Sequence, residues 1–163
     1  MFLSTIAHRC PAAAELGRSA AEARMGDVFG SLAWNADLDW WSGTAEVSPC
    51  HRIDLHVEAA NDPAALRVAV TQAWPAWDRL RAAEPSVRAA VAGQMTDAHN
   101  GYCDPADEVT PEQFADRLRL LSARFEASRA VELVYADGML FGGHWIIVPV
   151  GADGTVGEAS EAG

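Results

Sequence analysis

Hydrophobic and polar residues alternate in two blocks of the chain and recur at helical spacing between them. In the first block, residues 27–34, 38–47 and 51–58 have the composition and period of strands, with a turn at residues 35–37. The last of these strands alternates most clearly, because its residues divide into an apolar face and a polar face. The apolar face is Ile53, Leu55 and Val57, and the polar face is Asp54, His56 and Glu58.

The middle of the chain has the period of helices. Asn61-Asp62-Pro63 is typical of a helix start, because an aspartate caps the helix and a proline suits its first turn. The interior Pro75 predicts a kink or break, and Glu84-Pro85 predicts the start of a second helix that ends at residues 100–101. The sequence Thr110-Pro111-Glu112-Gln113 predicts a short helix over about 111–118.

The last block returns to the period of strands. Residues 119–127 and 131–135 predict two more strands, residues 141–150 contain a third, and Asp137-Gly138 predicts a turn. Strands, then helices, then strands predict an α+β fold. We expect a mostly antiparallel sheet built from an N-terminal and a C-terminal three-strand block, with two to three helices packed on one face. Residues 27–155 would form this single domain, after a variable N-terminal helical extension (1–26) and before a frayed tail (156–163).

Composition excludes several classes of function. The net charge of the 163 residues is −11, and all 12 basic residues are arginine, so lysine chemistry and phosphate-binding P-loops are excluded. So negative a chain repels phosphate backbones, and we expect no nucleic-acid partner. No apolar run reaches the length of a membrane span, and the first ten residues lack a secretory pattern. We therefore expect a cytoplasmic protein without a membrane partner.

Metal and cofactor binding have little support in the sequence. Cys10, Cys50 and Cys103 are far apart, so they predict neither a disulfide framework nor a zinc ribbon. The histidines near them, at positions 51, 56 and 99, lack the spacing of structural zinc ligands. We predict no metal and no cofactor.

One loop offers candidate catalytic residues. Gly142-Gly143 precede His144, and glycines allow close approach of a ligand to the backbone. A histidine at this position can act as an acid or a base, and Asp137 at the other end of the loop can orient it. In the alternative interpretation the glycines form a bulge, His144 is structural and Asp137 only makes the turn. The sequence leaves both interpretations open.

Aromatic and acidic residues offer candidate binding surfaces. Adjacent residues on a strand point to opposite faces, so one of Trp40 and Trp41 is expected in the core and the other at a surface. Acidic residues between positions 97 and 116 form either a solvated face or a surface for a basic partner. The candidate binding residues are Trp40, Trp41, Tyr135, Phe141, Gly142, Gly143, Asp104, Asp107 and Glu108.

Four segments carry a resemblance to a known family. They are LDWWSGTAEV (38–47), AVTQAWPAWDRL (69–80), TPEQFADRL (110–118) and YADGMLFGGHWIIV (135–148). Together they resemble the bacterial proteins grouped as domain of unknown function 2262, over about residues 27–155. The resemblance implies a soluble bacterial α+β domain and carries no assigned activity.

Two function classes follow from these observations. The leading hypothesis is a non-enzymatic, acidic binding protein that recognises another, basic protein, for example an immunity protein that neutralises a basic nuclease toxin. The alternative is a small enzyme or ligand-binding domain with its pocket at the loop from Asp137 to His144. The sequence lacks G-x-S-x-G, G-x-G-x-x-G, Walker A and H-E-x-x-H motifs, which favours the first class without excluding the second.

Overall fold

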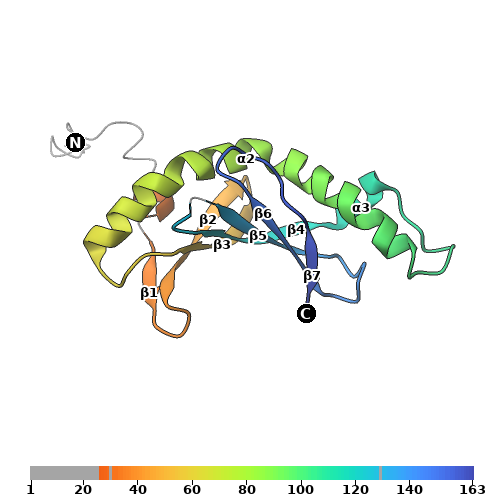
Figure 1. Cartoon of the computed structure of the whole chain (residues 1–163), viewed down its shortest axis with the longest axis horizontal. Coiled ribbons are helices and arrows are strands. Elements are labelled where there is room, and N and C mark those ends of the chain that lie inside the picture. The colour runs from red at the N-terminus through yellow and green to blue at the C-terminus, as the bar shows by residue number, and fades with distance from the viewer. Residues whose placement is uncertain (1–25, 30, 129) are drawn as a thin grey trace, which may run out of the picture.

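The computed structural model describes residues 26–29, 31–128 and 130–163, which form one open sheet covered by helices (Figure 1). The predicted N-terminal extension lies outside the described residues, except for residue 26. The strands are β1 (Ala33–Asn35), β2 (Trp40–Ser48), β3 (His51–Val57), β4 (Arg119–Phe125), β5 (Val131–Ala136), β6 (Trp145–Val150) and β7 (Ser160–Ala162). The two longer helices are α2 (Pro63–Asn100) and α3 (Pro111–Arg117), and residues 26–29 form a short helical turn.

The strands lie in the sheet in the same order as in the chain. All neighbouring pairs are antiparallel except β3 and β4, which are parallel. A parallel pair needs a long crossover connection, and here α2 and α3 supply it. The predicted α+β class with a mostly antiparallel sheet is confirmed. The crossover joins the two predicted strand blocks edge to edge and sets His56 opposite Arg124.

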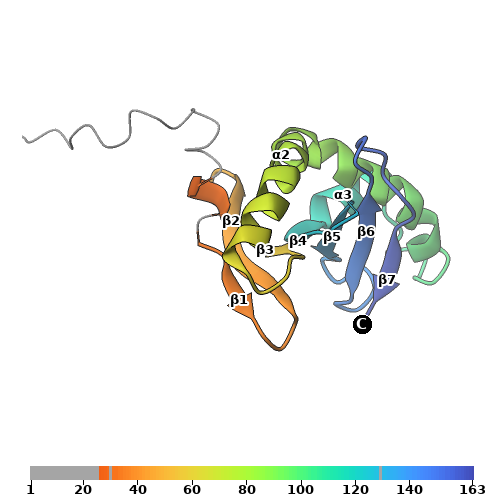
Figure 2. The same ribbon diagram turned by 60° about the vertical axis from the view of Figure 1, so that its left-hand side comes forward.

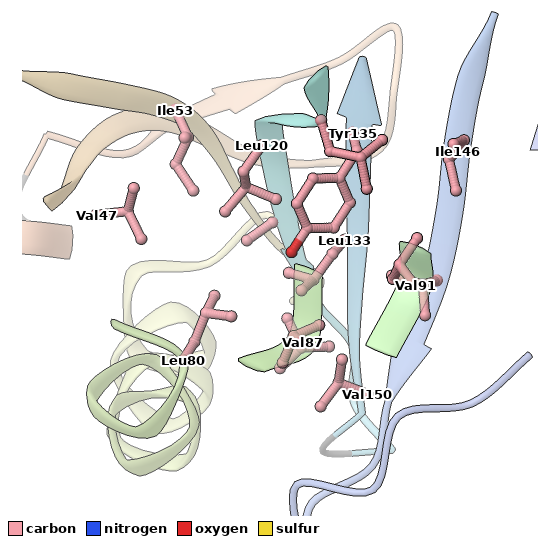
Figure 3. Packing of buried hydrophobic residues seen from close by; sticks show 14 of the residues in the cluster. Val47, Ile53, Leu80, Val87, Val91, Leu120, Leu133, Tyr135, Ile146 and Val150 are labelled. Atoms are coloured by element: carbon pink, nitrogen blue, oxygen red, sulfur yellow. The ribbon is translucent and has the colours of Figure 1, made fainter. Parts of the chain in front are cut away.

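The two faces of the sheet differ in what covers them. One face packs against α2, and the buried strand residues point toward that helix, as Figure 3 shows for Ile53, Leu120 and Leu133. The helix contributes Leu80, Val87 and Val91 to the same core, among other buried residues. Among the described residues, no helix lies against the other face of the sheet in Figures 1 and 2. We call this second side the open face.

Helix α2 is one continuous helix of 38 residues, so of the predicted kink or break at Pro75 the break does not occur, and the predicted second start at Pro85 is wrong. Both prolines are exposed, on the side of the helix away from the sheet. Buried residues such as Trp77 and Val87 lie beside the prolines and fix the helix to the sheet. This packing outweighs the cost of about 3 kcal/mol that an interior proline imposes. The helix arches over the sheet with its convex side toward solvent (Figure 1).

The ends of the helices follow the sequence signals. Asp62 caps α2 by accepting a hydrogen bond from the amide of Ala65, at 2.8 Å. Thr110 and Gln113 form the predicted capping box of α3. These contacts satisfy amide groups that the first turn of a helix leaves without partners.

The two ends of the described chain depart from prediction. Residues 27–34 were expected to be a strand, but residues 26–29 are helical and β1 begins only at Ala33. Phe29 is buried beside Trp74, Trp77 and Phe125, so core packing outweighs the local strand pattern. The tail was expected to fray, but Ser160–Ala162 pair with β6 as β7. Backbone pairing with a neighbouring strand orders these small and polar residues.

Candidate functional site

The carboxylate of Asp137 is occupied by its own loop. It is almost fully buried and accepts hydrogen bonds from the backbone amides of Met139 (2.9 Å), Phe141 (2.7 Å) and Gly143 (3.0 Å). A buried carboxylate needs such partners, and these three amides fix the conformation of residues 137–143. Asp137 therefore closes the turn, as in the second interpretation of the sequence.

The side chain of His144 bonds elsewhere. Its Nδ1 atom contacts the carboxylate of Glu161 on β7, and both side chains are exposed. Asp137 meets His144 only through the backbone, where its amide donates to the carbonyl of His144 at 3.3 Å. The expected contact between the two side chains is not formed, because the Asp137 carboxylate faces its own loop.

The aromatic residues flanking this loop belong to the interior. Tyr135 is fully buried on β5, and its ring points toward α2 (Figure 3). Burial raises the pKa of its hydroxyl well above the usual value. Phe141 is partly buried and packs edge-to-face against His99 and Phe114. The Nδ1 atom of His99 lies 2.9 Å from the carbonyl oxygen of Leu140, which fastens the loop to the end of α2.

The predicted acidic cluster lies on the connection between α2 and α3. Asp104, Asp107 and Glu108 are exposed there, and none of their carboxylates forms a salt bridge within the described residues. Asn100 holds the connection in place through two hydrogen bonds to Val109, each of 3.0 Å. These three predicted site residues therefore lie on an exposed acidic loop at the C-terminal end of α2.

The two adjacent tryptophans divide between the two faces as expected. Trp41 lies on the helix side, packs edge-to-face on Trp34 and donates its indole hydrogen to the carbonyl of Ala60, at 3.1 Å. Trp40 lies on the open face, together with Ser42 two residues later. Of this pair, Trp40 is thus available for a surface site.

A compact polar cluster surrounds Trp40 on the open face. The hydroxyl oxygen of Ser42 lies 3.1 Å from Nδ1 of His56, and the rings of Trp40 and His56 stack at 5.1 Å with a tilt of 36°. Partial burial lowers the pKa of His56. The nearby Asp54 opposes this shift, and Arg124 adds to it. His56 is therefore a largely neutral imidazole at pH 7 and can accept the hydroxyl proton of Ser42.

Arg124 is the second half of this cluster. Its guanidinium lies over the Trp40 ring, 5.2 Å from the centroid, and its Nη2 atom lies 2.9 Å from Glu126 and 3.7 Å from Glu132. The bond to Glu126 raises the pKa of Arg124, to which Glu132 and Glu58 also contribute. The same bond lowers the pKa of Glu126. A cation held both by carboxylates and by an aromatic face is fixed in orientation.

We call this set the open-face cluster: Trp40, Ser42, His56, Arg124, Glu126 and Glu132. Sequence reasoning placed only Trp40 among the site residues. The alternation at 51–58 did assign His56 to a polar face, but Arg124 lies 68 positions later in the chain. Only the parallel register of β3 and β4 brings His56 and Arg124 together.

The described residues were also compared with the requirements of a pocket, a metal site and a membrane span. Three hollows formed by the described residues lie along α2, and neither Asp137 nor His144 lines any of them. Within the described ranges, no three His, Cys, Asp or Glu residues are grouped so as to hold a metal ion. In the same part of the chain, no helix combines the length and the hydropathy of a membrane span.

Comparison with known proteins gives a family. No curated protein and no solved structure matches this chain. The model of one family, described as an uncharacterized protein conserved in bacteria (DUF2262), matches residues 26–160, a span that includes β1 to β6 and both longer helices. The chain therefore belongs to the DUF2262 family of bacterial proteins.

Proposed function

We propose that this protein is a non-enzymatic binding protein that recognises a basic partner protein on the open face of its sheet. The observation that carries the proposal is the difference between the two faces. One face is closed by α2, whereas the other presents an ordered aromatic and charged cluster that no helix of the described residues covers. An immunity protein that neutralises a basic nuclease toxin is one protein of this kind.

The charges of the open face support a basic partner. Its strands and their ends carry five carboxylates against three guanidinium groups; they are Glu46, Asp54, Glu58, Glu126, Glu132, Arg52, Arg119 and Arg124. The whole chain has the same sign, with a net charge of −11. Complementary charge accelerates encounter and selects the partner.

The same charges argue against a second copy of this chain. A symmetric dimer through the open face would oppose one acidic surface to another, and like charges across an interface cost free energy. Arginine and lysine side chains of a different protein would instead meet carboxylates. The indole rings of Trp40 and the exposed Trp145 add the kind of aromatic surface that interfaces favour.

The organisation of the cluster also supports binding. Arg124 is stacked on Trp40 and bonded to Glu126, so these side chains are ordered before a partner arrives. Ordered side chains lose less conformational entropy on association. The surface is therefore prepared for a partner and does not have to be assembled by it.

A capture experiment with matched charge changes tests this proposal. The double variant Glu46→Arg, Asp54→Arg alters the open face, and the double variant Asp78→Arg, Asp97→Arg makes the same change of net charge on exposed positions of α2. Each protein is immobilised in an extract of its own host at low salt, and the captured proteins are identified. We expect a basic protein that the unchanged chain and the α2 variant retain and that the open-face variant loses.

Two results would count against the proposal. If no basic protein is captured at low salt, the acidic surface has no such partner in that extract. If the α2 variant loses the partner as fully as the open-face variant does, net charge alone governs binding. A partner that passes this comparison should also bind more weakly as salt is raised, because ions screen exposed charges over about 10 Å.

A further inference from the structure

We infer that binding on the open face is linked to protonation of His56: the neutral imidazole favours a basic partner, and the protonated imidazole releases it. This inference rests on the proposed function and adds a means of regulation to the same surface. It starts from the position of His56, which stacks on Trp40 and lies beside Ser42 at the centre of the open-face cluster.

The neighbours of His56 decide what protonation does. On β2, Ser42 and Trp40 contact the ring but carry no charge. On its own strand, Asp54 shares the same face and favours the protonated form, while on β4 Arg124 lies opposite in register and disfavours it. The partners of Arg124, Glu126 and Glu132, lie one step further away.

A proton on His56 changes both the hydrogen bonds and the charge of this surface. A neutral imidazole accepts the hydroxyl proton of Ser42 at Nδ1, whereas a protonated ring donates there, so the Ser42 hydroxyl has to turn. The added positive charge also lies beside Arg124 and reduces the acid excess of the face. Both changes occur at the stack that orders Trp40.

The direction of the effect follows from these charges. One unit charge at about 8 Å from a partner cation changes the affinity by roughly five-fold at an interfacial dielectric constant of about 40. The partner therefore binds more weakly as pH falls from about 7.5 to 5.5, a range in which exposed carboxylates stay mostly ionised. By linkage, a bound basic partner lowers the proton binding constant of His56 by the same factor, and so lowers its pKa.

The test uses the whole chain and a synthetic peptide of alternating arginine and serine as a probe. Its affinity is measured at low salt by fluorescence anisotropy at about pH 7.5 and 5.5, and its site by NMR shifts of the Trp40 indole and the His56 ring. For the unchanged protein we expect weaker binding at the lower pH, by up to roughly five-fold when His56 is fully protonated. We also expect a lower pKa of His56 with the peptide bound.

Two matched variants separate His56 from other groups. His56→Gln keeps a hydrogen-bonding side chain beside Ser42 but cannot be protonated, so it should bind nearly equally at both pH values. His144→Gln removes an exposed histidine that is bonded to Glu161 away from the cluster, and it should keep the full pH effect. Far-UV circular dichroism checks that both variants are folded.

The possible outcomes distinguish this inference from the proposal beneath it. If the peptide shifts the open-face signals but His56→Gln keeps the pH effect, the linkage is wrong and the binding surface stands. If His144→Gln alone abolishes the effect, His56 is likewise not the responsible group. If the peptide shifts no open-face signal at either pH, the proposed binding surface and the linkage fail together.

Discussion

The loop of residues 137–143 and the open-face cluster both contain an acid beside polar and aromatic residues, yet they use these residues in opposite ways. In the loop, every hydrogen bond of the Asp137 carboxylate goes to backbone amides of the same short segment. In the cluster, side chains from four different strands contact one another at a surface. A local motif whose polar groups form hydrogen bonds with one another stabilises the fold. A cluster assembled across strands at a surface is able to contact a partner.

This comparison is tested most strongly at Asp137. Asp137→Ala should lower the free energy of unfolding by about 3 kcal/mol, because three backbone amides of the loop lose a buried charged acceptor. Urea unfolding followed by tryptophan fluorescence measures the loss. Asp153→Ala is the control, since the exposed Asp153 accepts one bond, from Thr155, and should change the urea midpoint far less. Equal midpoints for the two variants would show that the Asp137 contacts are not structural.

The glycines of the same loop give the second test. Gly138 has a φ angle of +60°, and a Cβ atom there would lie 2.6 Å from the carbonyl oxygen of Arg117. A left-handed conformation costs an alanine roughly 1–2 kcal/mol. Because this clash adds to that cost, Gly138→Ala should destabilise the fold by more than this amount. Gly142 has a φ angle of +80° but open space around it, so Gly142→Ala should lose about that backbone cost alone. Thermal unfolding compares the two, and a greater loss for Gly142→Ala would contradict this packing.

The smallest expected effect is the contribution of His56 to the change in the free energy of unfolding as pH falls. The pKa of folded His56 lies below the usual histidine value of about 6.5, so the unfolded chain takes up its proton first as pH falls. The stabilising contribution is complete above about pH 6.5 and is lost as pH falls through the folded pKa. Since His56 is only partly buried, the loss should stay below about 1 kcal/mol. Urea unfolding of the unchanged chain and of His56→Gln between about pH 7.5 and 5 measures it, and parallel curves would exclude this contribution.

Prediction succeeded where the signal is local. The alternation of Ile53, Leu55 and Val57 gave the buried face of β3, and the capping box gave the start of α3. Prediction failed at Pro75 and Pro85, because burial of the apolar stripe of α2 outweighs a local preference against proline. It also failed at the C-terminal tail, where pairing with β6 orders residues that have little strand propensity of their own.

The candidate site shows the same limit. The sequence identified Asp137 and His144 because they flank one loop, and it identified Trp40 as one of two adjacent tryptophans. The sequence could not predict that His56 lies beside Arg124 or that Arg124 lies over Trp40, because those contacts depend on the register between distant strands. The exposed acidic residues Asp104, Asp107 and Glu108 remain predictions of a binding surface and lie at the C-terminal end of α2.

The sequence by itself determined the α+β class, the family, the negative charge and the buried face of β3. It could do so because period, capping and charge act over a few residues or over the whole chain. Only the tertiary structure decided that β3 and β4 are parallel neighbours, that α2 is unbroken and that Trp40, His56 and Arg124 lie together. The reason is that these features follow from burial and strand pairing between segments far apart in the chain, and those energies outweigh local preference.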